Sequence, residues 1–166
     1  MATRFREANL LDLDGLVALV GRANETYYEW AGAGWSPPEP VRERGHWSSR
    51  IAEDGAWAAV AERDGRAVGC ASFEPADGRN GVAYLSRLFV DPKLWRAGIG
   101  SALLGEAIAE MRERDFEWAE LYAAAGNASA RVFYERRGWR AEDQTRHWHG
   151  LTLIRFSLDL ALLPSA

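Results

Sequence analysis

Two closely spaced glycines separate a strand-like segment from a helix-like segment, and this arrangement constrains the fold more than any other feature of the chain. The stretch VDPKLWRAGIGSALL runs from Val90 to Leu104 and places Gly98 and Gly100 directly before an alanine- and leucine-rich run. Glycine allows backbone to approach a neighbouring group closely, and the first turn of a helix presents unpaired N–H groups to an anion. The stretch therefore predicts a strand, a tight turn and a helix whose N-terminus binds a phosphate.

The composition of the chain is that of an ordinary globular domain. Its 166 residues are 48% hydrophobic and 27% charged, and a formal net charge of −4 argues against binding to nucleic acid. A single cysteine, Cys70, rules out an internal disulfide, and together with three histidines it gives a poor basis for a metal site. No segment has the pattern of a signal peptide or reaches the ~18 apolar residues of a membrane helix. We therefore expect one cytoplasmic domain over residues 1–166, with no metal and with no nucleic-acid or membrane partner.

Eight tryptophans are the unusual feature of the composition. Trp30, Trp35 and Trp47 lie in the first third of the chain, near Tyr27 and Tyr28. These rings either pack in the core or line a pocket for an apolar or cationic ligand. The sequence leaves both interpretations open.

Apolar periodicity and turn residues divide the chain into helices and strands. The pattern predicts helices over residues 10–30, 41–54, 100–116 and 128–138. It predicts strands within residues 3–12, 55–63, 66–78, 81–92, 118–127 and 151–160, so that one or two strands follow the last helix. Asp64–Gly65 marks a hairpin turn, and the glycines and prolines of residues 31–40 mark a loop. This order predicts an α/β or α+β fold in which helices pack on the faces of a sheet of mixed strand direction.

Two common phosphate-binding motifs do not fit the glycine-rich stretch. A P-loop requires a lysine after its second glycine, and none follows Gly98 or Gly100. The dinucleotide fingerprint Gly-x-Gly-x-x-Gly requires a third glycine at the position of Leu103. The stretch therefore belongs to another kind of site.

Residues 88–104, LFVDPKLWRAGIGSALL, resemble the acetyl-CoA site of the GNAT superfamily of N-acetyltransferases. In that superfamily, a strand ending in V-D-P is followed by Arg/Gln-x-x-Gly-x-Gly/Ala and a helix. Gly98 and Gly100 match the two glycines. Trp95 stands at the position that is usually Arg or Gln, with Arg96 beside it. The departure is mild, because phosphate binding in this motif comes mainly from backbone N–H groups.

A second stretch, NASARVFYERRGW, resembles the later motif of the same superfamily, Asn-x-x-Ala-x-x-Phe-Tyr-x-x-x-Gly-Phe. The matching residues are Asn127, Ala130, Phe133, Tyr134 and Gly138, with Trp139 for the final aromatic. The resemblance covers residues 66–139 well and the first sixty residues only by the order of elements.

The resemblance implies a fold and a reaction. The fold is a GNAT-like mixed, mostly antiparallel central sheet of 6–7 strands flanked by about four helices. The reaction is transfer of acetyl from acetyl-CoA, as cosubstrate, to a primary amine by direct attack, without a covalent enzyme intermediate. Cys70 lies in the apolar segment VGCASF and is therefore expected to be a small buried residue and no nucleophile.

The resemblance also implies which residues hold acetyl-CoA. The backbone N–H groups of Ala97–Ser101 would bind the pyrophosphate. The pantetheine arm would pair like an extra strand with the backbone of Leu88 and Val90, where an N–H facing the thioester oxygen can contribute about 3 kcal/mol. Asn127 would cap its helix, bond the pantetheine, or do both. The complete expected set is Leu88, Phe89, Val90, Trp95, Arg96, Ala97, Gly98, Ile99, Gly100, Ser101, Asn127, Ala130, Phe133 and Tyr134.

The reaction needs a proton donor and a proton acceptor. A thiol with a pKa of about 8.5 leaves faster when an acid protonates it, and the resemblance assigns this role to Tyr134, although a tyrosine here could simply pack beside Phe133. Many relatives carry a glutamate early in the V-D-P strand, and alignment on Asp91–Pro92 places Tyr84 there. Glu74, in ASFEP, is our first replacement for that base. Further candidates are Glu29, His46, His147 and His149.

The acceptor is the least constrained part of the site. The superfamily builds the acceptor pocket from the first helices and the last hairpin, here Glu25–Trp47 and Arg140–His149, which match no motif. The substrate contacts that we expect are Tyr28, Glu29, Trp30, Tyr84 and His147. The acceptor could be a polyamine, an aminoglycoside or another antibiotic, an amino acid or a protein N-terminus. The oligomeric state is open too, and a homodimer is possible.

Three other functions stay open as well. The chain could transfer a longer acyl group, or transfer acetyl to a hydroxyl. The alternative from another class is a catalytically inactive acyl-CoA-binding regulatory or sensor domain, which the missing glutamate at Tyr84 favours. Asn127 and Tyr134 argue against that alternative, because a domain that only binds needs no acid at the sulfur.

Overall fold

The structure is a computed structural model that describes residues 2–164. Within this range, the sheet consists of β1 (Arg4–Glu7), β2 (Trp57–Arg63), β3 (Arg66–Pro75), β4 (Val82–Val90), β5 (Trp118–Ala124), β6 (Arg140–Trp148) and β7 (Leu151–Asp159). The α-helices are α1 (Leu13–Glu25), α2 (Pro40–Ala52), α3 (Ile99–Glu113) and α4 (Ala128–Glu135). Short 3₁₀ segments are η1 (Leu10–Asp12), η2 (Thr26–Glu29), η3 (Pro92–Leu94) and η4 (Leu160–Leu162). In the described residues, no helix has both the length and the apolar character needed to cross a membrane.

The strands form one sheet in the order β1-β2-β3-β4-β5-β7-β6. Every neighbouring pair is antiparallel except β4 and β5, which are parallel. The prediction of a mixed, mostly antiparallel sheet flanked by four helices is therefore confirmed. Both of the strands allowed after the last helix are present, and β6 forms the edge of the sheet beside β7.

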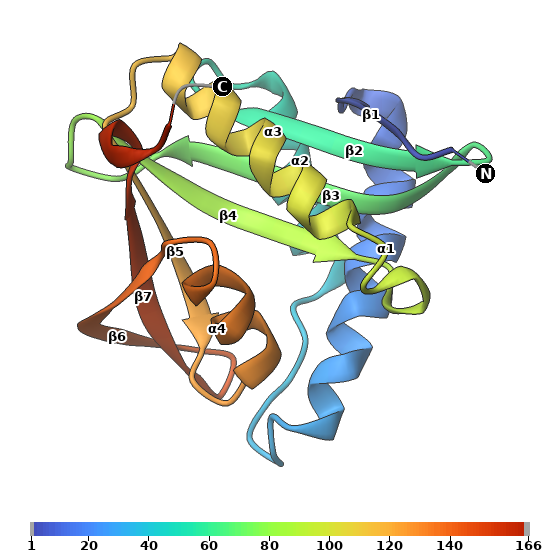
Figure 1. Cartoon of the computed structure of the whole chain (residues 1–166). Helices are drawn as coiled ribbons and strands as arrows, with labels where there is room; N and C mark the ends of the chain where they lie inside the picture. The colour runs from blue at the N-terminus through green and yellow to red at the C-terminus, as the bar shows by residue number, and fades with distance from the viewer. Residues whose placement is uncertain (1, 165–166) are drawn as a thin grey trace.

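The helices cover the two faces of the sheet (Figure 1). On one face, α3 packs through Leu103, Leu104 and Ala107 against the apolar side chains of β2, β3 and β4. On the other face, α1 and α2 bury Leu16 and Trp47 against the opposite side of the same strands. Cys70 lies in this second cluster and is fully buried, as expected from its apolar strand. The 3.6-residue periodicity of α1 and α3 thus places their apolar faces on the sheet.

Turn chemistry fixes several of the element boundaries. Asp64 and Gly65 have φ values of 53° and 73°, which are the left-handed values that a two-residue hairpin turn requires. The helix predicted over residues 10–30 is divided, because the Asn9 side chain accepts a hydrogen bond from the Leu11 N–H and starts η1 before α1 begins. After Glu25 the chain tightens into η2, so the helical phase changes there.

The strands β4 and β5 separate after a short paired region, and this separation positions the site. Their pairing is confined to Val82–Tyr84 of β4 and Trp118–Glu120 of β5. A bulge at Ser86 shifts the register between β3 and β4. Beyond the bulge, β4 continues along β3 while β5 diverges from it (Figure 1). The half of β4 that precedes the glycine-rich turn therefore has an open backbone edge on the side of β5.

Candidate active site

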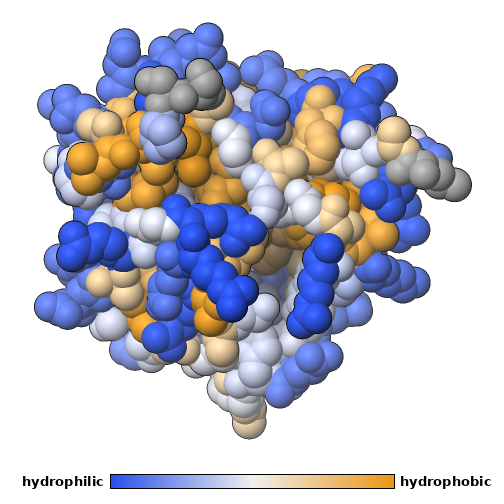
Figure 2. Space-filling view, viewed as in Figure 1, coloured by the Kyte–Doolittle hydropathy of each residue, from blue (hydrophilic) through white to orange (hydrophobic). Residues whose placement is uncertain are grey.

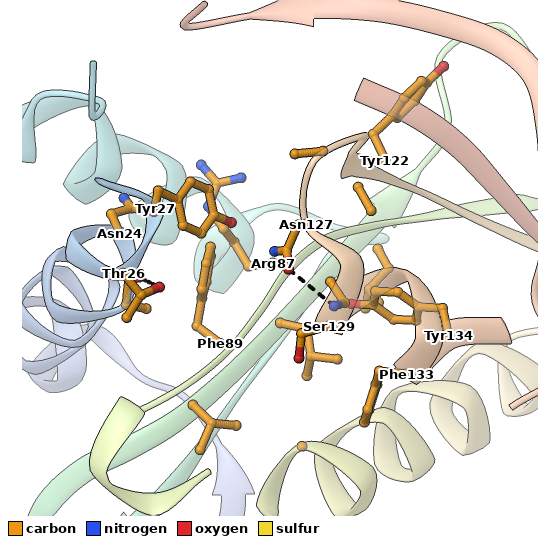
Figure 3. A pocket seen from close by; sticks show the side chains of 18 of the residues that line it. Asn24, Thr26, Tyr27, Arg87, Phe89, Tyr122, Asn127, Ser129, Phe133 and Tyr134 are labelled. Atoms are coloured by element: carbon orange, nitrogen blue, oxygen red, sulfur yellow. Dashed lines mark hydrogen bonds between the residues drawn. The ribbon is translucent and has the colours of Figure 1, made fainter. Parts of the chain in front are cut away.

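A cavity of about 1240 Å³ opens where β4 and β5 separate. Its walls come from the end of α1 and η2, from β4, from the start of α3, from β5 and α4, and from the β6–β7 hairpin. In Figure 3, Tyr27 of η2 lies on one side of Arg87 and Phe89 of β4, and Asn127 and Tyr134 lie on the other side. Figure 2 shows hydrophilic side chains around a hollow near the middle of this face. The cavity therefore joins the segments that carry the two sequence motifs.

The glycine-rich turn has the geometry of an anion site. Gly98 is the N-cap of α3 and has a φ of 85°, a left-handed value that glycine adopts without strain. The first hydrogen bond of the helix runs from the Ala102 N–H to the Gly98 carbonyl at 3.0 Å. The N–H groups of Ile99, Gly100 and Ser101 precede this bond, so the helix itself gives them no acceptor. They line the cavity and can bind a phosphate.

Gly100 lies between Val90 at the end of β4 and Phe133 of α4. A Cβ atom at this position would meet Val90 Cγ2 at 3.6 Å and two ring carbons of Phe133 at 3.8 Å. A single methyl group would therefore fit in ordinary contact, but a branched side chain would extend into the space between these two elements. The requirement for a small residue follows from this close approach.

Two arginines lie at the glycine-rich turn although the whole chain is acidic. Arg96 belongs to the turn, Arg137 of the segment after α4 bonds to Ser101, and both line the cavity, as does Arg136. The Arg137 guanidinium lies 3.7 Å from the centroid of the Phe133 ring and donates to the Ser101 hydroxyl. These positive charges, together with the positive end of the α3 dipole, favour an anionic ligand at this end of the cavity.

Trp95 takes a role that its motif position does not suggest. Its indole Nε1 donates to the Val90 carbonyl at 3.0 Å, and the side chain is about half exposed. The Asp91 N–H donates to the Val68 carbonyl on β3 at 2.8 Å. Because successive residues of a strand alternate, the Val90 N–H points away from β3 and toward the cavity. One carbonyl of the open β4 edge is thus paired by Trp95, and the N–H of the same residue has no partner on β3.

The α4 motif residues pack at the wall opposite η2. The Asn127 side chain accepts from the Ala130 N–H at 3.2 Å, so it caps α4. Tyr134 lines the cavity while its ring packs edge-on against Phe133 and Trp139. Burial raises the pKa of Tyr134 well above its usual range, so the phenol stays protonated at neutral pH. Its hydroxyl has no hydrogen-bond partner among residues 2–164 and can donate to a group in the cavity.

Glu74 lies next to the cavity without lining it. Its carboxylate pairs with Arg50 of α2, and the side chain is mostly buried. Burial raises the pKa of Glu74, while Arg50 and the Ser86 hydroxyl oppose this shift. Ser86, at the β4 bulge, does line the cavity, and its Oγ lies 2.8 Å from Ser72 Oγ. Ser86 therefore lies between the cavity and the buried side chains of Ser72 and Glu74.

The histidines are poor candidates for a base. His46 Nε2 lies 3.1 Å from Ser72 Oγ, behind Ser86. Burial, together with the charges of Arg87 and Arg50, lowers the pKa of His46 to about 2, so the ring stays neutral. His147 is exposed on β6 and lies near Thr152, and His149 forms the β6–β7 turn with a φ of 47°. Neither of these two histidines lines the cavity.

The acceptor end of the cavity combines aromatic rings with the side chains of Arg87 and Arg146. Tyr84, Tyr122 and Trp30 line it, and Glu29 lies at its edge on η2. Arg87 is held by Glu43 through contacts of 2.9 and 3.0 Å, and Glu43 is only 4% exposed. The tryptophans divide between the two interpretations: Trp30 and Trp148 line the cavity, whereas Trp35 and Trp47 are buried.

Most of the residues expected from the motifs meet in this cavity. Of the expected cofactor contacts, Ala97 is the one outside the lining. Of the expected substrate contacts, Glu29, Trp30 and Tyr84 line the cavity, whereas Tyr28 and His147 do not. Tyr28 is 64% exposed and packs against Trp35, while its neighbour Tyr27 faces the cavity (Figure 3). The lining residues that sequence reasoning missed include Asn24, Tyr27, Ser86, Arg87, Tyr122 and Arg146.

Comparisons with known proteins agree with this arrangement. The family model for the Acetyltransferase (GNAT) family matches residues 22–139. An uncharacterised N-acetyltransferase of Methanocaldococcus jannaschii is 32% identical over 107 residues, which cover 61% of this chain and 46% of that protein. The chain thus spans about half the length of this curated relative.

Solved structures match over nearly the whole chain. The ribosomal-protein-alanine N-acetyltransferase of Brucella melitensis has a TM-score of 0.73 and 26% identity, and the match covers 94% of this chain and 99% of that one. The PaiA N-acetyltransferase of Thermoplasma acidophilum, solved in complex with coenzyme A, has a TM-score of 0.75 and 19% identity, with 93% and 98% covered. Among residues 2–164, no cluster of His, Cys, Asp and Glu has the make-up of a metal site.

Proposed function

We propose that this chain, which belongs to the GNAT acetyltransferase family, moves the acetyl group of acetyl-CoA to a primary amine by direct attack. The observation that carries this proposal is the single cavity that joins the free N–H groups of α3, the open edge of β4 and the buried phenol of Tyr134. Family membership supports acetyl transfer, and the acceptor is a small molecule or a peptide. A cytoplasmic location and a homodimer stay predictions from the sequence.

The phosphates of acetyl-CoA fit the glycine-rich turn. The N–H groups of Ile99–Ser101 and the positive end of the helix would bind the pyrophosphate. Arg96 and Arg137 would neutralise the remaining negative charge. The absence of a side chain at Gly100 leaves the space between β4 and α4 through which the cofactor must pass.

The open edge of β4 fits the amide-rich pantetheine arm. The backbone groups of Leu88 and the N–H of Val90, which β5 does not pair, would hold the arm in the manner of an added strand. Such pairing would orient the thioester along the strand and toward the acceptor end of the cavity. Bound in this way, acetyl-CoA supplies a carbonyl carbon that an amine can attack.

Tyr134 would protonate the departing sulfur. The phenol is protonated at neutral pH because burial raises its pKa, and its hydroxyl is not held by any other described residue. A positioned acid of this kind contributes about 10²–10⁴-fold in rate. The alternative of an inactive sensor domain gains no support from this geometry.

Glu74 would take the proton of the amine through Ser86. Tyr84 occupies the strand position where many relatives carry the base, and a phenol whose pKa burial raises cannot accept a proton at neutral pH. The Ser86 hydroxyl lies in the cavity wall, and Glu74 is the buried carboxylate behind it. Because burial raises the pKa of Glu74, this carboxylate is a stronger base than an exposed one.

Two measurements test the proposal. The first is the thermal melting midpoint of the purified protein with acetyl-CoA, NADH or ATP, because a specific ligand of the native state raises the midpoint. A shift with acetyl-CoA alone is expected. The second is release of free thiol from acetyl-CoA in the presence of a panel of amines, with mass spectrometry of the products. A folded protein that shows no shift with acetyl-CoA would remove the basis of the proposal.

A further inference from the structure

Arg146 is a cation in the acceptor end of the cavity that no carboxylate of residues 2–164 neutralises. Its guanidinium lies 3.8 Å from the centroid of the Tyr122 ring and donates to the Tyr84 hydroxyl at 2.8 Å. No acidic side chain of the described residues pairs with it. Since Arg146 lines the cavity, its charge faces the space that an acceptor would occupy.

Tyr84 and Tyr122 position the Arg146 guanidinium so that it can bind an anion. The Tyr122 ring supports one face of the guanidinium, and the Tyr84 hydroxyl fixes one of its nitrogens. Arginine has five N–H donors in a rigid plane, so most of them stay available in this arrangement. A planar fork of N–H groups matches the two oxygens of a carboxylate, and a guanidinium that is already positioned loses little entropy on binding.

The other charges of the acceptor end do not compete for Arg146. Glu43 is occupied by Arg87, whose remaining amino group donates to the Ser86 carbonyl at 2.8 Å. Glu29 is exposed on η2 and makes no ion pair with Arg146.

Glu120, the register partner of Tyr84, is buried and already paired with Arg79 and Arg155, so it does not neutralise Arg146. Apolar and aromatic side chains near Arg146 include Leu153, its register partner on β7, and Trp148 on the same strand. The balance of charge at this place therefore favours an anionic group next to an apolar one.

We propose that Arg146 binds a carboxylate of the acceptor, so that the preferred acceptors are primary amines carrying a carboxylate and an apolar side group, as apolar amino acids do. This inference rests on the proposed function, because it assigns the acceptor of the same cavity. Arg146 acts here as a specificity-determining residue, and the chemistry of attack and of thiol departure stays with the residues described above.

The test compares matched acceptors that differ in the carboxylate alone. Three sets are used, each built on L-phenylalanine, L-leucine or L-methionine, with the corresponding α-amide and the corresponding decarboxylated amine. Initial rates of thiol release at saturating acetyl-CoA give kcat/KM for each compound. We expect at least one amino acid to exceed its amide and its amine by about 10- to 100-fold, the range of a charge-assisted hydrogen bond. Equal values across all sets, or a preference for the decarboxylated amines, would overturn the proposal.

Variants of Arg146 connect the preference to this side chain. In Arg146→Gln the ratio of kcat/KM between the amino acid and its decarboxylated amine should fall toward one, mainly through a higher KM for the amino acid. Arg146→Lys should restore part of the preference. The matched control is Arg140→Gln on the same strand, since Arg140 is exposed and lies outside the cavity lining. A carboxylate preference that survives in Arg146→Gln would refute the assignment.

Binding measurements separate this inference from the proposed function. Calorimetry with the CoA-bound protein measures the affinity for each compound without any turnover. Binding that depends on the carboxylate and on Arg146, without acetylation of any amine, would support the anion site and contradict the proposed reaction. Acetylation of amines without a carboxylate preference in binding or in rate would support the proposed reaction and contradict the anion site at Arg146.

Discussion

Replacing Tyr134 with phenylalanine isolates the proposed acid, because the change removes one hydroxyl and leaves the ring. The ring packs against Phe133 and Trp139, and these contacts stay in the variant. The hydroxyl has no hydrogen-bond partner among the described residues, so its loss leaves no protein group unpaired. We expect the free energy of unfolding to change by less than about 1 kcal/mol. The variant should therefore fold and melt like the parent protein.

The expected loss of rate follows from the leaving group. A thiol with a pKa of about 8.5 is a fair leaving group near neutral pH even without an acid. The contribution of Tyr134 should therefore lie at the lower end of the range for acid catalysis, at about 100-fold in kcat. This corresponds to about 2.7 kcal/mol in the activation free energy.

The assay is thiol release from acetyl-CoA with an amine that the parent enzyme acetylates, together with calorimetry of acetyl-CoA binding. The expected result is a kcat about 100-fold lower with the affinity for acetyl-CoA changed by less than about threefold. An unchanged kcat would refute the assignment and pass the acid role to water or to another residue. A loss of affinity as large as the loss of rate would show that the hydroxyl serves binding.

Three further perturbations have defined outcomes. Gly100→Val should reduce acetyl-CoA affinity by more than about 100-fold in calorimetry while the protein stays folded, since valine extends between β4 and α4; unchanged affinity would contradict the phosphate site. In a pH–rate profile, activity should fall as the pH drops through the pKa of Glu74, at a midpoint above the ordinary value of 4.5, and Glu74→Gln should lower the rate and remove this limb; a limb that persists would exclude Glu74. Gly150→Ala should destabilise the protein by roughly 2 kcal/mol or more in urea unfolding, because its φ is 80° and a Cβ would overlap the Gly34 carbonyl. The control Gly21→Ala, which has open space in α1, should instead stabilise it by about 1 kcal/mol.

The parts of this protein that sequence predicts well are those whose structure depends on the conformation of the local backbone. The glycine-rich turn can be recognised from residue types alone. Gly98 has a left-handed backbone that favours glycine, and Gly100 lies close to side chains of β4 and α4. The hairpin at Asp64–Gly65 is predictable for the same reason. Such features depend on a few adjacent residues, so their pattern survives in the sequence.

The residues that were missed depend on contacts between distant segments. Tyr27 faces the cavity in place of Tyr28 because the chain changes from α-helical to 3₁₀ spacing at η2. The apolar pattern of the sequence does not predict this change. Ser86 reaches the cavity because of the bulge in β4, which is visible only against β3. Arg146 belongs to an edge strand that is exposed along nearly its whole length, so alternation gives no sign of which side chains turn inward.

The short contact between β4 and β5 also divides the molecule mechanically. Within the described residues, the backbone pairing between the β1–β4 part of the sheet and the β5–β7 part is limited to three residue pairs, from Val82–Trp118 to Tyr84–Glu120. We expect this short seam to behave as a hinge, so that small rotations about it would change the width of the gap between the two parts. A ligand that bonds to β4 on one side and packs against α4 on the other would bridge the gap and stiffen the hinge. Amide hydrogen exchange along Val82–Tyr84 should then slow when the gap is filled, although no ligand atom need touch those residues.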